Sequence, residues 1–358
     1  MIGTPPSPCF AKQMTSSKFA TAWRSPTSWL TTSLLLGCAV VGALLAGNTS
    51  PAFAADPSKP VYSTPRTAKQ VMFGTLNVDG LNIAYREAGD PKNPKVVLLP
   101  GFPASSHQYR DLVVALADRF HVIAPDYQGF GNSDAPDPAK YAYTFDAISV
   151  TMEKFLVAKG FNRFGLYAQD YGGPVGFRIV GRHPEMLEWL IVQNTNAYEE
   201  GFTKVWDGLR GALWKNRSPE TEKPLAGFLT HDAIKGIYVH GAAHPEVISP
   251  DNWESDFGFM QRPHSVRMNL DLFYDYRTNV ALYPEWQKFL RTRQPKTLIF
   301  WGQDDIFFTP QGGEAYLRDL PKAELHRLAA GHFAVEDNLD YIASHMKKFY
   351  DACVKTAN

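Results

Sequence analysis

The stretch Phe164-Gly165-Leu166-Tyr167-Ala168-Gln169-Asp170-Tyr171-Gly172-Gly173 decides the fold that this sequence predicts. Its first five residues form a short apolar run typical of a buried strand, and a helix is predicted to begin near Gly173. A side chain presented on a sharp strand-to-helix turn needs small residues two positions before and after it, and Ala168 and Gly172 meet that need. The residue presented is Asp170. An Asp that caps the next helix would explain the same letters, so the surrounding sequence has to decide.

Short apolar runs on both sides of this turn alternate with helix-length segments, which is typical of a mostly parallel sheet covered by helices. Residues 71–78 and 81–86 flank Asp79-Gly80, a strong signal for a hairpin turn. We therefore predict an α/β fold with a mostly parallel central sheet. The other predicted strands are residues 96–99, 121–125, 189–192, 297–301 and 323–328, with helices over 109–117 and 339–350.

This alternation breaks between residues 195 and 284, where helical pieces rich in Trp, Tyr and Phe replace it. The segment is too long for a bare loop in a compact domain. We interpret it as a helical cap over the carboxyl ends of the strands, where ligands of such sheets bind. Residues 71–194 and 285–358 would then form the two parts of one core domain.

The first 54 residues have the pattern of a secretory signal peptide. Basic residues precede an apolar run at 34–45, and the segment ends in Ala52-Phe53-Ala54, so cleavage is expected after Ala54. An uncleaved anchor is the alternative, but the run is shorter than the roughly 20 residues that span a bilayer. We expect export to the periplasm or the medium, without stable membrane association after cleavage, and a flexible lead-in over 55–70. The start codon is Met1 or Met14.

Charge and composition limit the partners of the chain. Lys+Arg and Asp+Glu number 36 each among 358 residues, so no net field attracts nucleic acid or an anionic membrane. A small, largely apolar molecule is the expected partner. No Cys/His cluster has the spacing of metal ligands, and neither a metal nor another cofactor is predicted. The oligomeric state stays open.

Three further features each follow a predicted strand, and their order along the chain indicates a function. Gly101-Phe102 follows the strand at 96–99, so the backbone N–H groups of Phe102 and Tyr171 are predicted to form an oxyanion hole. Asp305 follows the strand at 297–301, and His332 follows the strand at 323–328. Each has an ordinary explanation as a turn or a structural histidine. The order nucleophile, acid, base favours a catalytic triad of Asp170, Asp305 and His332.

From about residue 72 onward the chain resembles the α/β-hydrolase superfamily, and more narrowly its Asp-nucleophile branch of epoxide hydrolases and haloalkane dehalogenases. The resemblance implies an α/β-hydrolase fold with a cap, and attack by Asp170 on a saturated carbon to give an alkyl ester of the enzyme. His332, held by Asp305, would then activate the water that cleaves the ester. The matching pieces are Gly101-Phe102-Pro103, Gly129-Phe130-Gly131-Asn132-Ser133-Asp134, Gln169-Asp170-Tyr171-Gly172-Gly173, Trp301-Gly302-Gln303-Asp304-Asp305 and Gly331-His332-Phe333.

The same resemblance ranks the substrates. Haloalkane dehalogenases bind the halide with a Trp after the nucleophile plus a second Asn or Trp, where this chain has Tyr171 and Phe102. Epoxide hydrolases protonate the epoxide with a cap tyrosine, and residues 275–279 resemble the segment that carries it. Tyr276 is therefore our first candidate, with Tyr238 and Tyr274 as alternatives for a second phenol, although an ordinary core tyrosine explains each equally well.

Epoxide hydrolase is thus the first expectation and haloalkane dehalogenase the alternative. An esterase or lactonase, which would need Ser at position 170, and a non-catalytic ligand-binding homologue rank lower.

Overall fold

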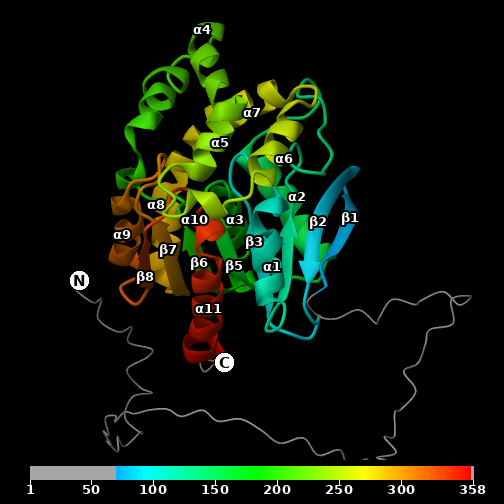
Figure 1. The fold of residues 1–358 in the computed structure, drawn as a ribbon, viewed down its shortest axis with the longest axis vertical. Coiled ribbons are helices and arrows are strands. Elements are labelled where there is room, and N and C mark those ends of the chain that lie inside the picture. The colour runs from blue at the N-terminus through cyan, green and yellow to red at the C-terminus, as the bar shows by residue number, and fades with distance from the viewer. Residues whose placement is uncertain (1–69, 356–358) are drawn as a thin grey trace, which may run out of the picture. The chain divides into compact units, whose positions relative to one another are not determined.

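The computed structural model describes residues 70–355, which form an eight-stranded sheet with helices on both faces (Figure 1). The predicted signal peptide and all but the last residue of the predicted lead-in lie outside the described residues. No helix among residues 70–355 has both the length and the apolar character needed to cross a bilayer.

The sheet has the strand order β1-β2-β4-β3-β5-β6-β7-β8. The first two strands form the hairpin predicted around Asp79-Gly80, and β2 runs antiparallel to β4. All remaining neighbours pair in parallel. The predicted α/β fold with a mostly parallel sheet is confirmed. The strands are β1 (Met72–Val78), β2 (Leu81–Ala88), β3 (Lys95–Leu99), β4 (His121–Pro125), β5 (Phe164–Gln169), β6 (Leu187–Gln193), β7 (Lys296–Gly302) and β8 (Glu324–Leu328).

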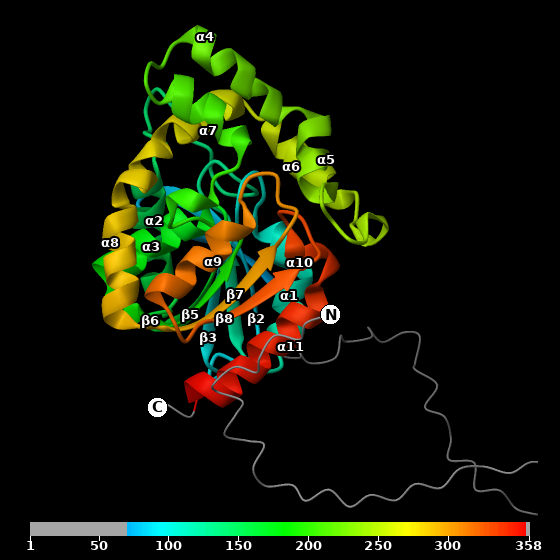
Figure 2. The same cartoon turned by 90° about the vertical axis from the view of Figure 1, so that its left-hand side faces the viewer.

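Helices cover both faces of the sheet, which is why every residue of β4 and β5 is buried. One face carries α1 (Arg110–Leu116) and α11 (Leu339–Phe349), which contact each other. The other face carries α2, α3, α8 and α9, as two perpendicular views show (Figures 1 and 2). Their bounds are α2 (Phe145–Ala158), α3 (Gly172–Arg182), α8 (Arg277–Arg293) and α9 (Pro310–Asp319).

The segment between β6 and β7 is helical and lies over one end of the sheet (Figure 2). It contains short helical turns from Glu199 onward and then α4 (Pro219–Glu222), α5 (His231–Val239), α6 (Asp251–Met260) and α7 (Ser265–Asp275). We call residues 195–276 the cap. The boundary predicted at residue 284 falls inside α8, because Pro284 lies in the interior of that helix rather than at its end. Its missing N–H removes one helical hydrogen bond, yet the helix continues.

Candidate active site

Asp170 lies directly after β5, on the sharp turn that leads into α3. Its φ of +46° is in the left-handed region, which costs a non-glycine residue about 1–3 kcal/mol. Two contacts hold this backbone: the Asp170 N–H donates to the Asn194 carbonyl at 3.1 Å, and the Thr195 hydroxyl donates to the Asp170 carbonyl at 2.7 Å. A Cβ on Gly172 would lie 2.2 Å from the Leu99 carbonyl oxygen, so the turn requires glycine there. The strained turn holds the carboxylate at the carboxyl end of the sheet.

The Asp170 carboxylate already occupies the predicted oxyanion hole. The Phe102 N–H donates to its Oδ1 at 2.7 Å, and the Tyr171 N–H binds the same carboxylate. The loop after β3 approaches closely because Gly101 has no side chain: a Cβ there would lie 2.6 Å from the Asp170 Cβ. Backbone donors in this arrangement can stabilise negative charge on Oδ1 while Oδ2 remains free to react.

His332 and Asp305 complete a triad-like arrangement. The His332 Nδ1 lies 2.9 Å from Asp305 Oδ2, and its Nε2 lies 4.0 Å from Asp170 Oδ2. Asp305 also accepts from Asn194 Nδ2 at 2.8 Å and from the Phe307 N–H at 2.7 Å. A carboxylate only accepts hydrogen bonds, so His332 carries a proton on Nδ1, and the orienting acid is itself fixed on both oxygens.

Asn194 is a site residue that the sequence analysis did not identify. It follows β6 and also exchanges two hydrogen bonds with the backbone of Gly302, so it joins the ends of β6 and β7. In the sequence, Asn194 is a polar residue at the end of an apolar strand. In the structure that strand, β6, lies between the strands that precede Asp170 and Asp305. A polar residue at a strand end becomes a specific signal only when the strand order is known.

Burial and neighbouring charge shift the pKa values of the two ionisable groups that face each other. Burial raises the pKa of Asp170 to about 6, against the opposing influence of His332 and of the N–H groups of Phe102 and Tyr171. Burial alone would lower the pKa of His332. The charge and hydrogen bond of Asp305, together with the charge of Asp170, outweigh it and raise the pKa of His332 above its ordinary value.

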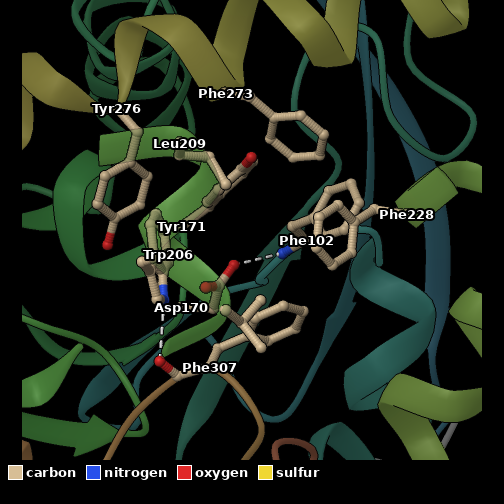
Figure 3. A pocket seen from close by; sticks show the side chains of 10 residues that line it. Phe102, Asp170, Tyr171, Trp206, Leu209, Phe228, Phe273, Tyr276 and Phe307 are labelled. Carbon is tan, nitrogen blue, oxygen red and sulfur yellow. Dashed lines mark hydrogen bonds between the residues drawn. The ribbon is translucent and has the colours of Figure 1, made fainter. Parts of the chain in front are cut away.

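A cavity lined mainly by aromatic and aliphatic side chains opens at Asp170. Figure 3 shows aromatic rings on most sides of the Asp170 carboxylate. The walls of the cavity come from the core and the cap and are apolar except for Asp170 and two phenols. The lining residues are Phe102, Asp170, Tyr171, Val205, Trp206, Leu209, Phe228, Phe273, Tyr276 and Phe307.

Tyr276 supplies a free phenol to this cavity. Its hydroxyl is buried without a hydrogen-bond partner and points toward the side where Trp206 and Asp170 lie (Figure 3). Burial first, and then the neighbouring Tyr283 phenol and the Asp170 charge, raise the pKa of Tyr276 well above its ordinary value. Tyr283, on α8, also has a buried hydroxyl without a partner and a raised pKa. Both phenols therefore keep their protons at neutral pH, and of the two Tyr276 lines the cavity.

The segment that carries Tyr276 is attached to the core on both sides. Asp275 Oδ2 accepts from the Phe145 N–H at the start of α2, at 2.8 Å. After Tyr276, Asn279 Oδ1 accepts from Arg178 of α3 at 2.6 Å, and the Thr278 hydroxyl accepts from the same guanidinium at 3.0 Å. These three contacts fix the Tyr276 backbone to the helices that flank the sheet.

Tyr238 and Tyr274, the alternative phenols, do not line the cavity. The Tyr238 hydroxyl donates to the buried Asp256 at 2.6 Å, and its ring stacks on Phe333 at a centroid distance of 4.2 Å. Tyr274 is half-buried, with the Arg277 guanidinium 3.5 Å from its ring centroid. In a helix, residues 274 and 276 point in different directions, so proximity in sequence did not place them together. The two phenols that line the cavity are Tyr276 and Tyr171, and the Tyr171 hydroxyl is likewise buried without a hydrogen-bond partner.

Few N–H donors face the cavity. Among its described lining residues, Trp206 carries the one side-chain N–H, and this group donates to the Phe307 carbonyl at 2.9 Å. The described residues also contain no group of three or more His, Cys, Asp or Glu that could hold a metal ion.

Comparison with known proteins agrees with this architecture. Residues 94–339 match the family model described as the alpha/beta hydrolase fold. The chain belongs to the α/β-hydrolase family. An uncharacterized hydrolase of Saccharomyces cerevisiae is 36% identical over 271 residues, which cover 75% of this chain and 93% of the relative. The family model and this relative support hydrolase activity, as the sequence predicted.

Two further comparisons show proteins to which this chain is similar. A haloalkane dehalogenase of Bradyrhizobium diazoefficiens is 26% identical over 287 residues, covering 74% of this chain and 89% of the relative. The solved structure of the epoxide hydrolase CorEH superimposes with a TM-score of 0.64 over 79% of this chain and 99% of that one. At 18% identity this second likeness shows the shared fold alone.

Proposed function

We propose that this α/β-hydrolase is an epoxide hydrolase with Asp170 as its nucleophile. The observation that carries the proposal is the Tyr276 phenol, protonated and without a partner in an apolar cavity that Asp170 also lines. A carboxylate attacks a saturated carbon well, and an epoxide oxygen needs an acidic O–H as its carbon–oxygen bond breaks.

In the first step, Asp170 Oδ2 attacks an epoxide carbon while Oδ1 stays bound to the Phe102 N–H. The carbon–oxygen bond of the ring breaks, and its oxygen takes the proton of Tyr276, with Tyr283 stabilising the phenolate. The product is a hydroxyalkyl ester of Asp170. The aromatic walls exclude water from this step and favour an apolar substituent on the epoxide.

In the second step, His332 Nε2 takes a proton from a water that attacks Cγ of Asp170. Negative charge then develops on Oδ1, between the N–H groups of Phe102 and Tyr171. Asp305 stabilises the imidazolium through the 2.9 Å hydrogen bond to Nδ1. Collapse of the intermediate releases the diol, and the imidazolium proton returns through the product oxygen or water to the Tyr276 phenolate.

Haloalkane dehalogenase is the rival function, and it is less well supported because a departing halide needs N–H donors. The Trp206 N–H is bound to a carbonyl, and Tyr171 and Phe102 offer no side-chain N–H. The test is a panel of terminal epoxides, haloalkanes and small lactones given to the purified protein, with diol, halide and hydroxy acid measured together. We expect diol alone. Halide release without diol formation would replace the proposal, and turnover of lactones alone would favour the lactonase alternative.

The pKa values predict how the two steps respond to acid. Asp170 attacks only as a carboxylate, so the first step should fall to half near pH 6 and be lost below it. His332 accepts a proton only when neutral, and the charge and hydrogen bond of Asp305, with the charge of Asp170, raise the pKa of His332 above its ordinary value. Ester that has already formed should therefore be hydrolysed more slowly as the pH is lowered below neutral, because a protonated His332 cannot take a proton from water. Rapid quenching and intact-protein mass spectrometry across pH 5 to 8 measures this; ester levels independent of pH would contradict it.

Export of the protein is also part of the proposal and rests on the sequence of residues 1–54 alone. Amino-terminal sequencing of protein recovered outside the cytoplasm of the source cell should begin at Ala55. Full-length protein retained inside the cell would overturn this point without affecting the proposed chemistry.

A further inference from the structure

A chain of buried amides leads from the loop after β3 to the imidazole of His332, and the mechanism above does not use it. The Gly101 N–H donates to Gln108 Oε1 at 3.2 Å, and Gln108 Nε2 donates to Gln169 Oε1 at 3.3 Å. Gln169 Nε2 then lies 3.0 Å from His332 Nε2 and 3.3 Å from the His332 carbonyl oxygen. All three side chains are almost fully buried.

The direction of this chain is fixed at both ends. A backbone N–H can only donate, so the Gly101 N–H requires Gln108 to present its oxygen there and its NH₂ to Gln169. Gln169 must then direct its own NH₂ toward His332. The carbonyl of His332 can only accept, and this requires the same orientation of Gln169. Two independent contacts therefore agree that an N–H of Gln169 faces His332 Nε2.

An N–H donor facing Nε2 requires a lone pair on that nitrogen. His332 is therefore held as the neutral tautomer with its proton on Nδ1, where Asp305 accepts it. The charged groups that act on the ring are Asp305 and Asp170, and both favour the imidazolium. The rings of Phe307, Phe308 and Phe333 pack around the imidazole. Gln169 is thus the neighbour that opposes protonation.

We propose that Gln169 is a positioning residue that keeps His332 neutral, and Asp170 free to attack, until the ester has formed. Without this donor, a protonated His332 would turn its Nε2–H toward Asp170 Oδ2, which now lies 4.0 Å away. The carboxylate would then be held in an ion pair and could not attack the substrate. In the second step the incoming water replaces Gln169 at the single lone pair of Nε2. The Gln169 amide keeps its bond to the His332 carbonyl, so it stays in place during the exchange.

The matched control is Gln193, the last residue of β6. It is also a fully buried glutamine, and its Nε2 donates to the same His332 carbonyl at 3.3 Å, while its oxygen accepts from the Tyr167 hydroxyl. It makes no contact with Nε2 of the ring. Gln169→Met and Gln193→Met therefore remove equivalent buried amides, of which one faces the base.

The inference rests on the proposed role of His332, but its first test needs no substrate. The titration of His332 is followed by long-range ¹H–¹⁵N correlation in protein labelled with ¹⁵N-histidine. Loss of one neutral hydrogen bond should raise the midpoint in Gln169→Met by about one pH unit, and Gln169→Glu, which offers an acceptor, should raise it further. Gln193→Met should leave it at the wild-type value. If Gln169→Met does not fold, Gln108→Met should shift the midpoint in the same direction by less.

The kinetic consequence concerns the pH below which ester formation is lost, measured in a single turnover. In Gln169→Met this pH should rise by the same amount as the titration midpoint of His332. Equal midpoints in wild type and Gln169→Met, or an equal shift in Gln193→Met, would overturn the inference. If the midpoints shift as expected but no epoxide is consumed, the proposed function fails while the role of Gln169 in holding the neutral imidazole stands.

Discussion

His332→Gln protein incubated with an epoxide that the wild type consumes is expected to gain the full mass of one substrate molecule. Ester formation does not need His332, whereas hydrolysis loses its general base and should slow by about 10²–10⁴-fold. The ester then accumulates on Asp170 and can be seen by intact-protein mass spectrometry. Because an epoxide loses no atoms on opening, the added mass equals that of the substrate; a haloalkane would add the alkyl group without its halogen.

The control for this experiment is the double variant Asp170→Asn, His332→Gln, which lacks the nucleophile and should stay unmodified. Peptide mapping of the single variant should locate the added mass on the peptide that contains Asp170. Unmodified His332→Gln protein, after exposure to a substrate that the wild type turns over, would contradict the two-step mechanism.

Tyr276→Phe is expected to lower the rate of ester formation from epoxides by about 100-fold or more, because the ring oxygen loses its proton donor. The aromatic ring and its contact with Trp206, at a centroid distance of 4.5 Å, would remain, so binding should change little. The loss should therefore appear in kcat rather than in KM. Tyr283→Phe should cost less, since this phenol acts on the epoxide only through Tyr276.

Tyr238→Phe is the matched control on the cap. It removes a buried hydroxyl that binds Asp256 and lies outside the cavity, so it should affect stability and leave the rate of ester formation near the wild-type value. An equal loss in Tyr238→Phe and Tyr276→Phe would show that the hydroxyl of Tyr276 has no special role. Retention of full epoxide turnover in Tyr276→Phe would exclude it as the acid.

The core and its candidate triad could be predicted because the three residues each follow a predicted strand, in the chain order nucleophile, acid, base. Asp170, Asp305 and His332 each follow a strand of one parallel sheet, and the carboxyl ends of such strands lie along one edge. Small residues at Ala168 and Gly172 marked the turn, and at Gly172 the Leu99 carbonyl leaves no space for a side chain. These are local signals whose consequences follow from a known sheet geometry.

The walls of the cavity could not be predicted in the same way. The cap consists of short helical pieces, and their packing depends on contacts between residues distant in sequence. Trp206, Leu209 and Phe228 gave no signal that distinguishes a cavity wall from an ordinary core position. Tyr238 was a candidate only because it is a tyrosine in the predicted cap. The packing of α5 against α6 shows that its hydroxyl faces Asp256.

The attachment of residues 275–279 to α2 and α3 fixes the segment that carries Tyr276 to the core, independently of the earlier part of the cap. This has a consequence for how the protein can change in evolution. The segment that carries Tyr276, the proposed proton donor, is held by Phe145 and Arg178 of the core, whereas Val205, Trp206, Leu209 and Phe228 come from the preceding part of the cap. Residues 199–264 can therefore diverge, and with them the size and shape of the accepted molecule, while the proton donor stays where the nucleophile requires it. In the proposed enzyme, part of the cavity wall can therefore change without displacing the residues that react.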